Sequence, residues 1–337
     1  MTAATPFHHK GFNRMFRPGA MTLGLALPVA PLVNGVPDMS GQLERAAEAD
    51  RLGFATLWVR DVPLFDPSFD DAGQVYDPWV WLGQLATVTK TVALSSAGIV
   101  LPLRHPLHTA KAAASVDAVS GGRFLLGAAS GDRAAEYPAF GRDHASRGEA
   151  YRESVAVIRR TTSEDYPEFA AAFGSLRGLD LLPKPPGGHL PLLAVGSAQQ
   201  SLQWIARTMD GWVSYFRPIA DQRPRIELWQ RAVETQAAGV FRPVAQAMSL
   251  DLTEDPNADP EPLFLGYRLG RNRLIEDLHA FADEGVHHVM FNLRHSQRPV
   301  TEVMAELAEE ILPVFPSHLE GRPVRECSRG TSALGMT

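Results

Sequence analysis

The segment Ser40–Val59, SGQLERAAEADRLGFATLWV, contains one complete unit of the fold that the sequence predicts. Ser40 can cap a helix in which leucine and alanine recur at helical spacing, with charged residues between them. Gly53 stands where a helix commonly ends in a left-handed residue. Thr56–Val59 is then a short apolar run, typical of a strand buried on both faces. The segment therefore predicts a helix that leads directly into a buried strand.

The same alternation continues in both directions along the chain. Eight strands are predicted, at Thr22–Leu27, Thr56–Val59, Val92–Val100, Phe124–Ala128, Pro191–Val195, Gly211–Tyr215, Ala245–Leu250 and His288–Asn292. Eight helices are predicted with them, at residues 41–52, 79–87, 106–119, 145–159, 199–209, 225–238, 271–284 and 300–312. Strict alternation favours a parallel sheet, and eight repeats favour a single α/β (β/α)8 TIM barrel. An open dinucleotide-binding sheet would need a glycine-rich first turn, but the chain reads Leu27-Pro28-Val29-Ala30 there.

The predicted barrel occupies residues 20–315 and has extra segments around it. Residues 1–19 are polar and predict an N-terminal arm on the surface, and residues 316–337 predict a C-terminal tail. An insertion rich in proline and glycine, at about 161–188, separates the fourth helix from the fifth strand. Long insertions in barrels often help to build the active site.

Composition excludes several functional classes. The formal net charge is −6 and no basic run occurs, which argues against a nucleic-acid-binding protein. No apolar run approaches the length that a membrane-spanning helix needs. Cys327 is the only cysteine, so no intramolecular disulfide can form, and a cytoplasmic location is expected. Because the active sites of barrel enzymes lie at the C-terminal ends of their strands, the candidate residues are those at the ends of the predicted strands.

Three of these chemistries find little support. The four lysines lie in the arm, before strands or within a helix, so none can attack a carbonyl from a strand end. His287 and His288 come at the start of the last strand, which is the face of a barrel that serves stability rather than metal binding. Asp61, Asp132 and Asp251 are acids at strand ends, so a hydrolase with two carboxylates stays open, although no spacing favours it.

Anion binding is better supported. The fifth strand is followed by Gly196-Ser197-Ala198-Gln199-Gln200-Ser201, in which Ser197 is predicted to cap the next helix. Glycine lets the backbone approach a ligand, and the first turn of a helix offers N–H groups to a phosphate. The fourth strand is followed by Ser130-Gly131-Asp132-Arg133, which has a second glycine and hydroxyl. Two such turns on neighbouring strands predict a ligand that carries phosphate.

Several segments resemble the luciferase-like monooxygenase family, which includes flavin- and F420-dependent oxidoreductases. The similar segments, whose order and spacing also match over about residues 20 to 313, are RLGFATLWVRD at 51–61, SSAGIVLPLRHP at 95–106, DAVSGGRFLLG at 117–127 with Glu136 and Phe140-Gly141, and PLLAVGS at 191–197 with Ala206 and Asp210-Gly211-Trp212. The resemblance implies a (β/α)8 barrel that binds reduced FMN or the deazaflavin F420 at its mouth. It also implies a non-prolyl cis peptide at Ala97–Gly98 behind the cofactor ring. The residues implied at the cofactor phosphate are Ser130, Gly131, Gly196, Ser197, Gln199 and Gln200.

The chain departs from the family at one catalytic position. In luciferase a catalytic histidine follows the acidic residue after the second strand, whereas here Val62 follows Asp61. Asp61, Arg104 and His108 are the candidates for polar contacts with cofactor or substrate. His105 is either a helix cap or a catalytic residue, and no general base is assigned, because a base is identified by its reach to the proton.

These observations give three functional hypotheses. The first is a monooxygenase that uses reduced FMN from a separate reductase, with oxygen, on a small organic substrate. The second is an F420-dependent hydride-transfer enzyme, with Arg133, Arg142 and Arg147 beside the anionic cofactor tail. The third is a flavin-binding barrel without turnover. A homodimer is expected, with Trp79 and Trp81 either at its interface or in the core, and the substrate would contact loops at residues 63–76, 161–188 and 251–268.

Overall fold

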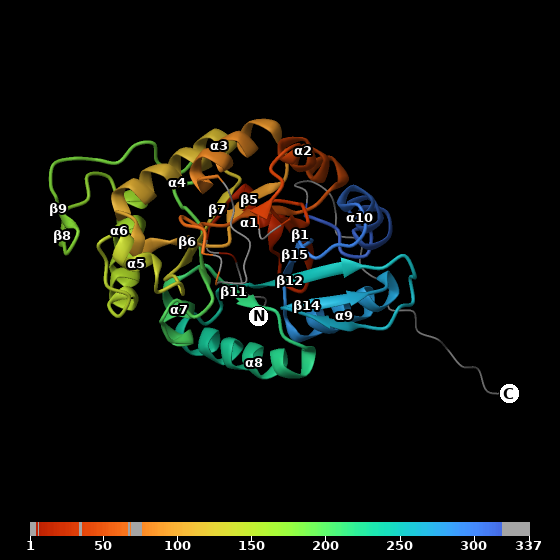
Figure 1. Ribbon diagram of the computed structural model, residues 1–337. Helices are drawn as coiled ribbons and strands as arrows, with labels where there is room; N and C mark the ends of the chain where they lie inside the picture. The colour runs from red at the N-terminus through yellow and green to blue at the C-terminus, as the bar shows by residue number, and fades with distance from the viewer. Residues whose placement is uncertain (1–4, 6, 34–35, 67, 69–75, 319–337) are drawn as a thin grey trace.

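The computed structural model describes residues 5, 7–33, 36–66, 68 and 76–318, and its central feature is a closed parallel barrel (Figure 1). The eight barrel strands are β1 (Thr22–Ala26), β4 (Thr56–Val59), β5 (Ala93–Ser96), β7 (Phe124–Ala129), β10 (Leu192–Val195), β11 (Gly211–Tyr215), β12 (Val244–Leu252) and β15 (His288–Asn292). Each strand pairs with the next in this order, and β15 pairs with β1 to close the barrel. The predicted TIM barrel is therefore confirmed.

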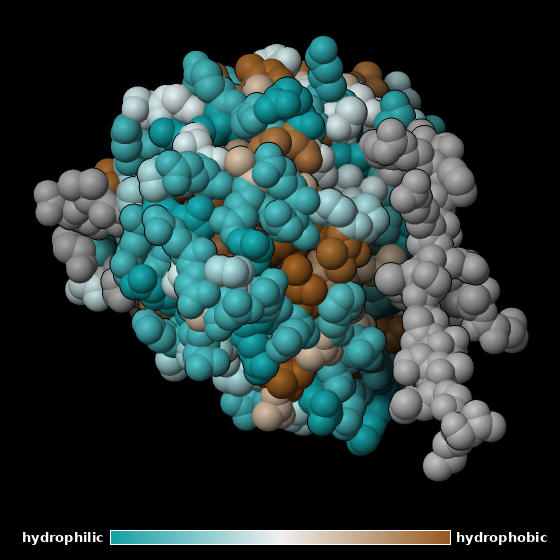
Figure 2. Space-filling view, turned by 90° about the vertical axis from the view of Figure 1, so that its right-hand side faces the viewer, coloured by the Kyte–Doolittle hydropathy of each residue, from teal (hydrophilic) through white to brown (hydrophobic). Residues whose placement is uncertain are grey.

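Helices surround the barrel, one after each strand. They are α2 (Gln42–Leu52), α3 (Pro78–Val88), α4 (Pro106–Ser120), α6 (Arg147–Ser163), α7 (Leu202–Thr208), α8 (Ile219–Gln236), α9 (Arg271–Glu284) and α10 (Val300–Glu306), which continues as a π-turn over Leu307–Ile311. Polar residues cover most of the face beside β14, α9 and α10, and apolar residues occur there in small groups (Figure 2). The pattern is that of helices with one face packed on a barrel.

The helix ends follow local chemistry. Gly53 ends α2 in a left-handed conformation, as predicted. The prediction that Ser40 caps this helix is wrong, because Gly41 occupies the N-cap and the Ser40 hydroxyl donates to Asp38 instead. Asp77 caps α3 through its carboxylate, which accepts from two backbone N–H groups. In α3, Trp81 is fully buried and belongs to the core rather than to an interface.

Smaller elements occupy the loops between these units. They are α1 (Lys10–Met15), β2 (Leu32–Val33), β3 (Val36–Pro37), β6 (Ile99–Val100), the 3-10 turn Leu101–Leu103, α5 (Glu136–Ala139), β8 (Phe169–Ala171), β9 (Gly174–Leu176), β13 (Glu261–Leu263) and β14 (Gly266–Leu269). The hairpin of β8 and β9 lies in the predicted insertion, at the edge of the molecule beside α5 and α6 (Figure 1). The hairpin of β13 and β14 lies beside the second half of the long strand β12, with which β14 pairs.

Residues 9–16 of the predicted N-terminal arm do not lie on the surface, as the polar composition predicts, but form or flank helix α1, most of which is buried. Phe12 and Met15 of α1 are fully buried and join a cluster with inward-facing barrel residues. The Gly11 N–H donates to the Gly122 carbonyl, and the Thr22 hydroxyl donates to the Met15 carbonyl. Because Gly122 precedes β7 and Thr22 begins β1, α1 closes the N-terminal end of the barrel and leaves the other end for ligands.

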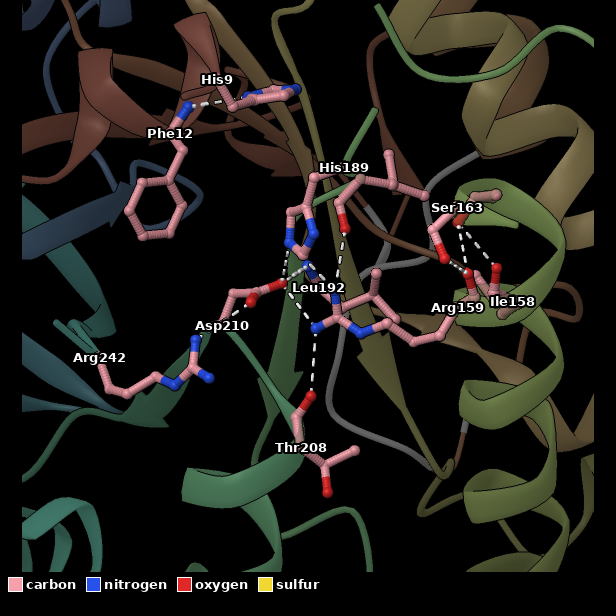
Figure 3. A network of polar contacts seen from close by, with 12 residues as sticks. His9, Phe12, Ile158, Arg159, Ser163, His189, Leu192, Thr208, Asp210 and Arg242 are labelled. Carbon is pink, nitrogen blue, oxygen red and sulfur yellow. Dashed lines mark hydrogen bonds and ion pairs between the residues drawn. The ribbon is translucent and has the colours of Figure 1, made fainter. Parts of the chain in front are cut away.

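A polar network also holds the N-terminal end of the barrel together. Asp210 precedes β11 and is 2% exposed, and Arg159, His189 and Arg242 are directed toward it (Figure 3). Its carboxylate oxygens lie 2.6 Å from Arg159 Nη2, 3.0 Å from His189 Nε2 and 3.1 Å from Arg242 Nη1, and they also accept from the Leu192 N–H. Burial acts to raise the pKa of Asp210, but these partners hold it well below its usual range. The network ties α6, β10, β11 and β12 together.

A buried histidine lies inside the barrel near α1. His288 Nε2 accepts from the Trp58 indole N–H at 3.1 Å, and its Nδ1 lies 2.8 Å from the Thr22 hydroxyl oxygen. Because that hydroxyl donates to Met15, His288 Nδ1 must be the donor of this pair. Gly24 packs against the ring so closely that a Cβ would lie 2.9 Å from it. His288 is therefore a neutral structural residue.

The buried histidines predict a loss of stability in acid. Burial lowers the pKa of His287 to about 4, of His288 to about 3 and of His318 to about 4, whereas an unfolded histidine titrates near 6.5. Their contribution is complete above pH 6.5 and is lost as the pH falls toward these values, because the unfolded state then binds more protons. We expect each of these three histidines to lower the free energy of unfolding by about 3 kcal/mol between pH 7 and 4. Urea unfolding at a series of pH values measures this, and His288→Gln should flatten the dependence.

Two further findings concern only the described residues. None of their helices is both long enough and apolar enough to span a lipid bilayer. Nor do they contain a group of three histidine, cysteine or acidic side chains positioned to hold a metal ion. Cys327 and most of the predicted C-terminal tail lie outside the described residues.

Candidate cofactor site

The C-terminal end of the barrel has a floor made mainly of small apolar side chains. Alternate residues of a strand share a face, so the interior cluster that contains Trp58, Val213 and Met290 identifies which later residues also face inward. We give the name mouth floor to eight residues on the inward-facing side near the C-terminal ends of the barrel strands: Ala26, Arg60, Ala97, Ala129, Val195, Tyr215, Ala247 and Asn292. All except Ala26 are at least partly exposed. Small apolar side chains at the base of an open barrel end leave space for a flat ring.

The loop after β10 turns sharply but does not start a helix at the predicted place. Gly196, Ala198 and Gln199 all have positive φ angles, of 66°, 47° and 59°. Helix α7 begins only at Leu202, where Ser201 is the cap, so the prediction that Ser197 caps it is wrong. The positive φ values divert the chain before a helix can form. Ser197 itself is exposed, and backbone turns of this kind can bind anions.

Gln200 has a structural role rather than the predicted contact with a phosphate. Its side-chain amide donates to the Gly148 carbonyl at 2.9 Å and to the Ala198 carbonyl at 3.0 Å, and its oxygen accepts from Arg152. These bonds fasten the loop after β10 to the first turns of α6. The loop after β10 is thereby held against α6, a contact that the sequence does not predict.

The loop after β7 also meets the start of α6. Gly131 has a φ of 75°, and a Cβ there would lie 2.7 Å from Val100 and 2.9 Å from the Tyr137 hydroxyl. That hydroxyl donates to the Ser130 carbonyl, and burial raises the pKa of Tyr137 to about 12. The Tyr137 ring packs edge-on against His144, with centroids 4.9 Å apart. Glycine and tyrosine therefore fix the path of this loop toward His144.

Two donors beside these loops have no hydrogen-bond partner. Arg147 Nη1 donates to the His144 carbonyl at 2.8 Å and lies 3.4 Å from His144 Nδ1, which must then accept, leaving a proton on Nε2. His144 Nε2 and Arg147 Nε are both buried and unpartnered. Unpartnered buried donors are costly, and the oxygens of an anion are acceptors suited to such groups. Arg147 also starts the 17-residue helix α6, whose N-terminus favours negative charge.

These residues form one candidate anion site, which we call the phosphate pocket: Ser130, Gly131, His144, Arg147, Gly196 and Ser197. Gly148 of α6 packs against the loop after β10, because a Cβ there would lie 3.0 Å from Gln199 Cβ, and the Tyr137 ring, which bonds the loop after β7, packs on His144 just before α6. The sequence therefore identified both loops. It did not identify Tyr137 or His144, whose roles depend on contacts that neither residue signals locally, and it assigned Arg147 only to a cofactor tail.

The cis peptide expected at Ala97–Gly98 is not present. Among the described residues, cis peptides occur only at Leu27–Pro28 and Leu182–Pro183. Ala97 lies on the mouth floor as expected, but Gly98 is buried against the β10 wall, where a Cβ would lie 2.9 Å from Val195 Cγ2 and 3.2 Å from the Ala128 carbonyl carbon. Close packing of β5, β7 and β10 thus explains this glycine without an unusual peptide bond.

Two of the three catalytic candidates form an ion pair between buried Asp61 and partly buried Arg104. Arg104 Nε and Nη2 donate to the two Asp61 oxygens at 2.9 and 2.6 Å, and the Val100 N–H donates to Asp61 at 3.0 Å. Burial opposes the charge of Arg104, but Asp61 raises its pKa above the usual value. Through these three hydrogen bonds, Asp61 holds the loop after β4 against the segment after β6.

The third candidate, His108, is exposed on α4, with its ring against His105. His105 is the cap of α4, since its Nδ1 accepts from the Leu107 N–H. A more unusual acid is Glu136, which is 5% exposed and has one oxygen without a hydrogen-bond partner, 3.6 Å from Arg133 Nη1. Burial raises its pKa. In the sequence, Glu136 is marked only by its place in a family motif.

The chain belongs to the luciferase-like monooxygenase family, whose model matches residues 21–254. Its curated relatives include an F420-dependent hydroxymycolic acid dehydrogenase of Mycobacterium tuberculosis, which is 29% identical over 202 residues. That match covers 58% of this chain and 53% of the dehydrogenase. The chain is thus a member of a family of oxidoreductases built on the barrel described above.

Solved structures show the same fold. An F420-dependent secondary alcohol dehydrogenase in complex with an F420–acetone adduct has a TM-score of 0.71 and 18% identity, over 88% of this chain and 99% of that one. A type II Baeyer–Villiger monooxygenase from Pseudomonas putida in complex with FMN has a TM-score of 0.68 and 14% identity, over 89% of this chain and all of that one. At these identities the likeness establishes the fold alone.

Proposed function

We propose that the protein is a monooxygenase that binds reduced FMN, with the flavin ring on the mouth floor and the phosphate in the phosphate pocket. The observation that carries this proposal is the pair of unpartnered buried donors on His144 and Arg147, beside the loops after β7 and β10. A phosphate monoester offers charge and acceptor oxygens to both donors. The small side chains of the mouth floor offer an apolar surface of the kind that an aromatic ring needs.

In this proposal the residues of the chain bind and orient, and bound reduced FMN supplies electrons for the reaction of dioxygen with the substrate. Arg147 and the loop at Gly196 hold the phosphate, while Ala97 and Val195 support the ring. Leu64 and Phe65, exposed in the loop after β4, provide apolar contacts for a small organic substrate and limit the access of water. A separate reductase supplies the reduced cofactor.

A second candidate is F420-dependent hydride transfer. Arg142 and Arg152 are exposed next to the phosphate pocket, Arg142 over the Phe173 ring and Arg152 on Gln200. FMN ends at its phosphate, whereas F420 continues into an anionic tail that these arginines could accompany. The dehydrogenase relative named above supports the same reading. A substitution of Arg142 distinguishes the two cofactors, because it should weaken the binding of F420 and leave the binding of FMN unchanged.

The phosphate pocket is tested by comparing FMN with riboflavin, which lacks the phosphate. We expect the wild-type protein to bind reduced FMN at least about 100-fold more tightly than reduced riboflavin under anaerobic conditions, because only FMN reaches Arg147 and His144. Ser197→Asp should weaken FMN binding about tenfold through repulsion between like charges and leave riboflavin unaffected. Ser197→Ala is the matched control. Equal affinities of the wild-type protein for both compounds would contradict the proposal.

A further inference from the structure

The N-terminal end of the barrel contains a buried arginine with too few acceptors. Arg14, in α1, is 6% exposed. Its Nη2 donates to the carbonyl of Phe54, between α2 and β4, at 3.3 Å. Its Nε and Nη1 are buried and have no hydrogen-bond partner in the part of the chain that the structure describes. Two of the three guanidinium nitrogens of Arg14 therefore lack an acceptor.

The charge of Asp50 acts on Arg14, but its carboxylate is bonded elsewhere. The oxygens of Asp50 accept from the Thr91 hydroxyl at 2.6 Å and from the Val92 N–H at 2.8 Å, just before β5. Burial lowers the pKa of Arg14, and the charge of Asp50 opposes this only in part. Asp50 therefore offsets some of the cost of burying Arg14 without supplying the acceptors that its nitrogens lack.

A second nitrogen without a partner lies at the same end of the barrel. The His318 N–H donates to the Arg14 carbonyl at 3.2 Å, which fastens the last described residue to α1. His318 is 9% exposed, and its Nε2 is buried with no hydrogen-bond partner among the described residues. Burial, and then the charges of Arg17 and Arg14, lower the pKa of His318 to about 4. The three side chains are thus close enough for their charges to repel.

This set of groups favours a negatively charged ligand. Buried donors without acceptors are costly, and the oxygens of an anion are acceptors suited to such groups. Arginine offers only donors, which excludes it as a ligand of a metal ion. An anion would also favour the form of His318 that carries a proton on Nε2 and donates from it.

We propose that the N-terminal end of the barrel binds a small oxyanion, of the size of sulfate or phosphate, between Arg14 and His318, with Arg17 adding positive charge. This end lies opposite the phosphate pocket, so the site does not depend on the proposed cofactor. The bound anion links α1, which closes this end of the barrel, to the segment that ends at His318. It stabilises the folded protein by mass action, because the unfolded chain has no such site.

The test is a calorimetric titration with sulfate, in which chloride keeps the ionic strength constant. We expect the wild-type protein to have a sulfate site that Arg14→Met weakens at least about tenfold, because the variant loses charge-assisted hydrogen bonds. Arg147→Met, altered in the phosphate pocket, should retain this site. His318→Phe keeps a ring but loses the donor, so it should weaken the site by less than Arg14→Met does. Arg231→Met is the control, because the Arg231 side chain is 72% exposed on α8.

Thermal unfolding gives a second measurement on the same proteins. Sulfate should raise the melting temperature of the wild-type protein above its value in chloride at equal ionic strength, and it should not do so for Arg14→Met. Circular dichroism confirms that each variant is folded. A variant of Arg14 that failed to fold would leave His318→Phe to decide, since it removes only the end of the site that belongs to the last described residue.

The other outcomes refute the inference in different ways. Sulfate binding that Arg147→Met loses and Arg14→Met keeps would assign the anion to the phosphate pocket. Glu320 follows His318 by two residues in the sequence. If sulfate does not bind and Glu320→Gln lowers stability only when Arg14 is present, a carboxylate of the chain is the partner of Arg14. Failure of the protein to bind FMN would end the proposed function and leave this inference standing.

Discussion

Asp210→Ala should lower the free energy of unfolding by about 3–5 kcal/mol, the cost of leaving buried charges without their partner. The substitution leaves Arg159, His189 and Arg242 without their carboxylate partner at the N-terminal end of the barrel, where their contacts to Asp210 are 2.6–3.1 Å long. It also removes the acceptor of the Leu192 N–H at the start of β10. Asp210→Asn keeps the volume and one acceptor, so its loss of stability should be smaller.

Urea unfolding followed by circular dichroism measures the effect of these substitutions. Asp283→Ala is the matched control, because Asp283 is exposed on α9 and its removal should change stability by less than about 0.5 kcal/mol. The network lies at the opposite end of the barrel from the phosphate pocket, so the folded fraction of Asp210→Asn should still bind FMN. A stability of Asp210→Ala within about 1 kcal/mol of the wild-type protein would contradict the structural role given to this network.

Arg147→Met should weaken binding of reduced FMN about 100-fold, equivalent to about 2.7 kcal/mol. The variant removes a positive charge and the unpartnered Nε donor from the phosphate pocket. Binding of riboflavin should stay as it is in the wild-type protein, because riboflavin has no phosphate to lose. Fluorescence titration under anaerobic conditions measures both affinities.

Arg142→Met is the control for this variant and also separates the two cofactors. Arg142 is exposed and lies over Phe173, next to the phosphate pocket. If FMN is the cofactor, Arg142→Met should bind it as the wild-type protein does. A clear loss of F420 affinity in Arg142→Met, together with tight F420 binding by the wild-type protein, would favour hydride transfer. Unchanged FMN binding by Arg147→Met would refute the phosphate pocket.

The barrel could be predicted from sequence because its signals are local and repeated. Each strand is a short apolar run, and each helix has a periodic apolar face, so the order of elements follows without any long-range contact. The strands at Thr56–Val59, Gly211–Tyr215 and His288–Asn292 have the predicted bounds. Helix α1 could not be predicted in the same way, because its polar surroundings conceal Phe12 and Met15, which are buried only through contact with distant strands.

The candidate site was predictable in part for the same reason. The glycines at 131 and 196 mark turns directly, and both have the positive φ angles that favour glycine. The joining of these turns by α6, and the lone donors on His144 and Arg147, depend on packing between segments far apart in sequence. Asp61 was a reasonable catalytic candidate by position, but its pairing with Arg104 is a tertiary contact.

The most direct test of the proposed function is an anaerobic titration of the purified protein with reduced FMN and, separately, with F420, followed by fluorescence or calorimetry. The account predicts micromolar or tighter binding of reduced FMN. Binding of F420 in preference to FMN would contradict the monooxygenase proposal and identify a hydride-transfer enzyme. Binding of neither compound would contradict the assignment of the mouth floor and the phosphate pocket to a cofactor.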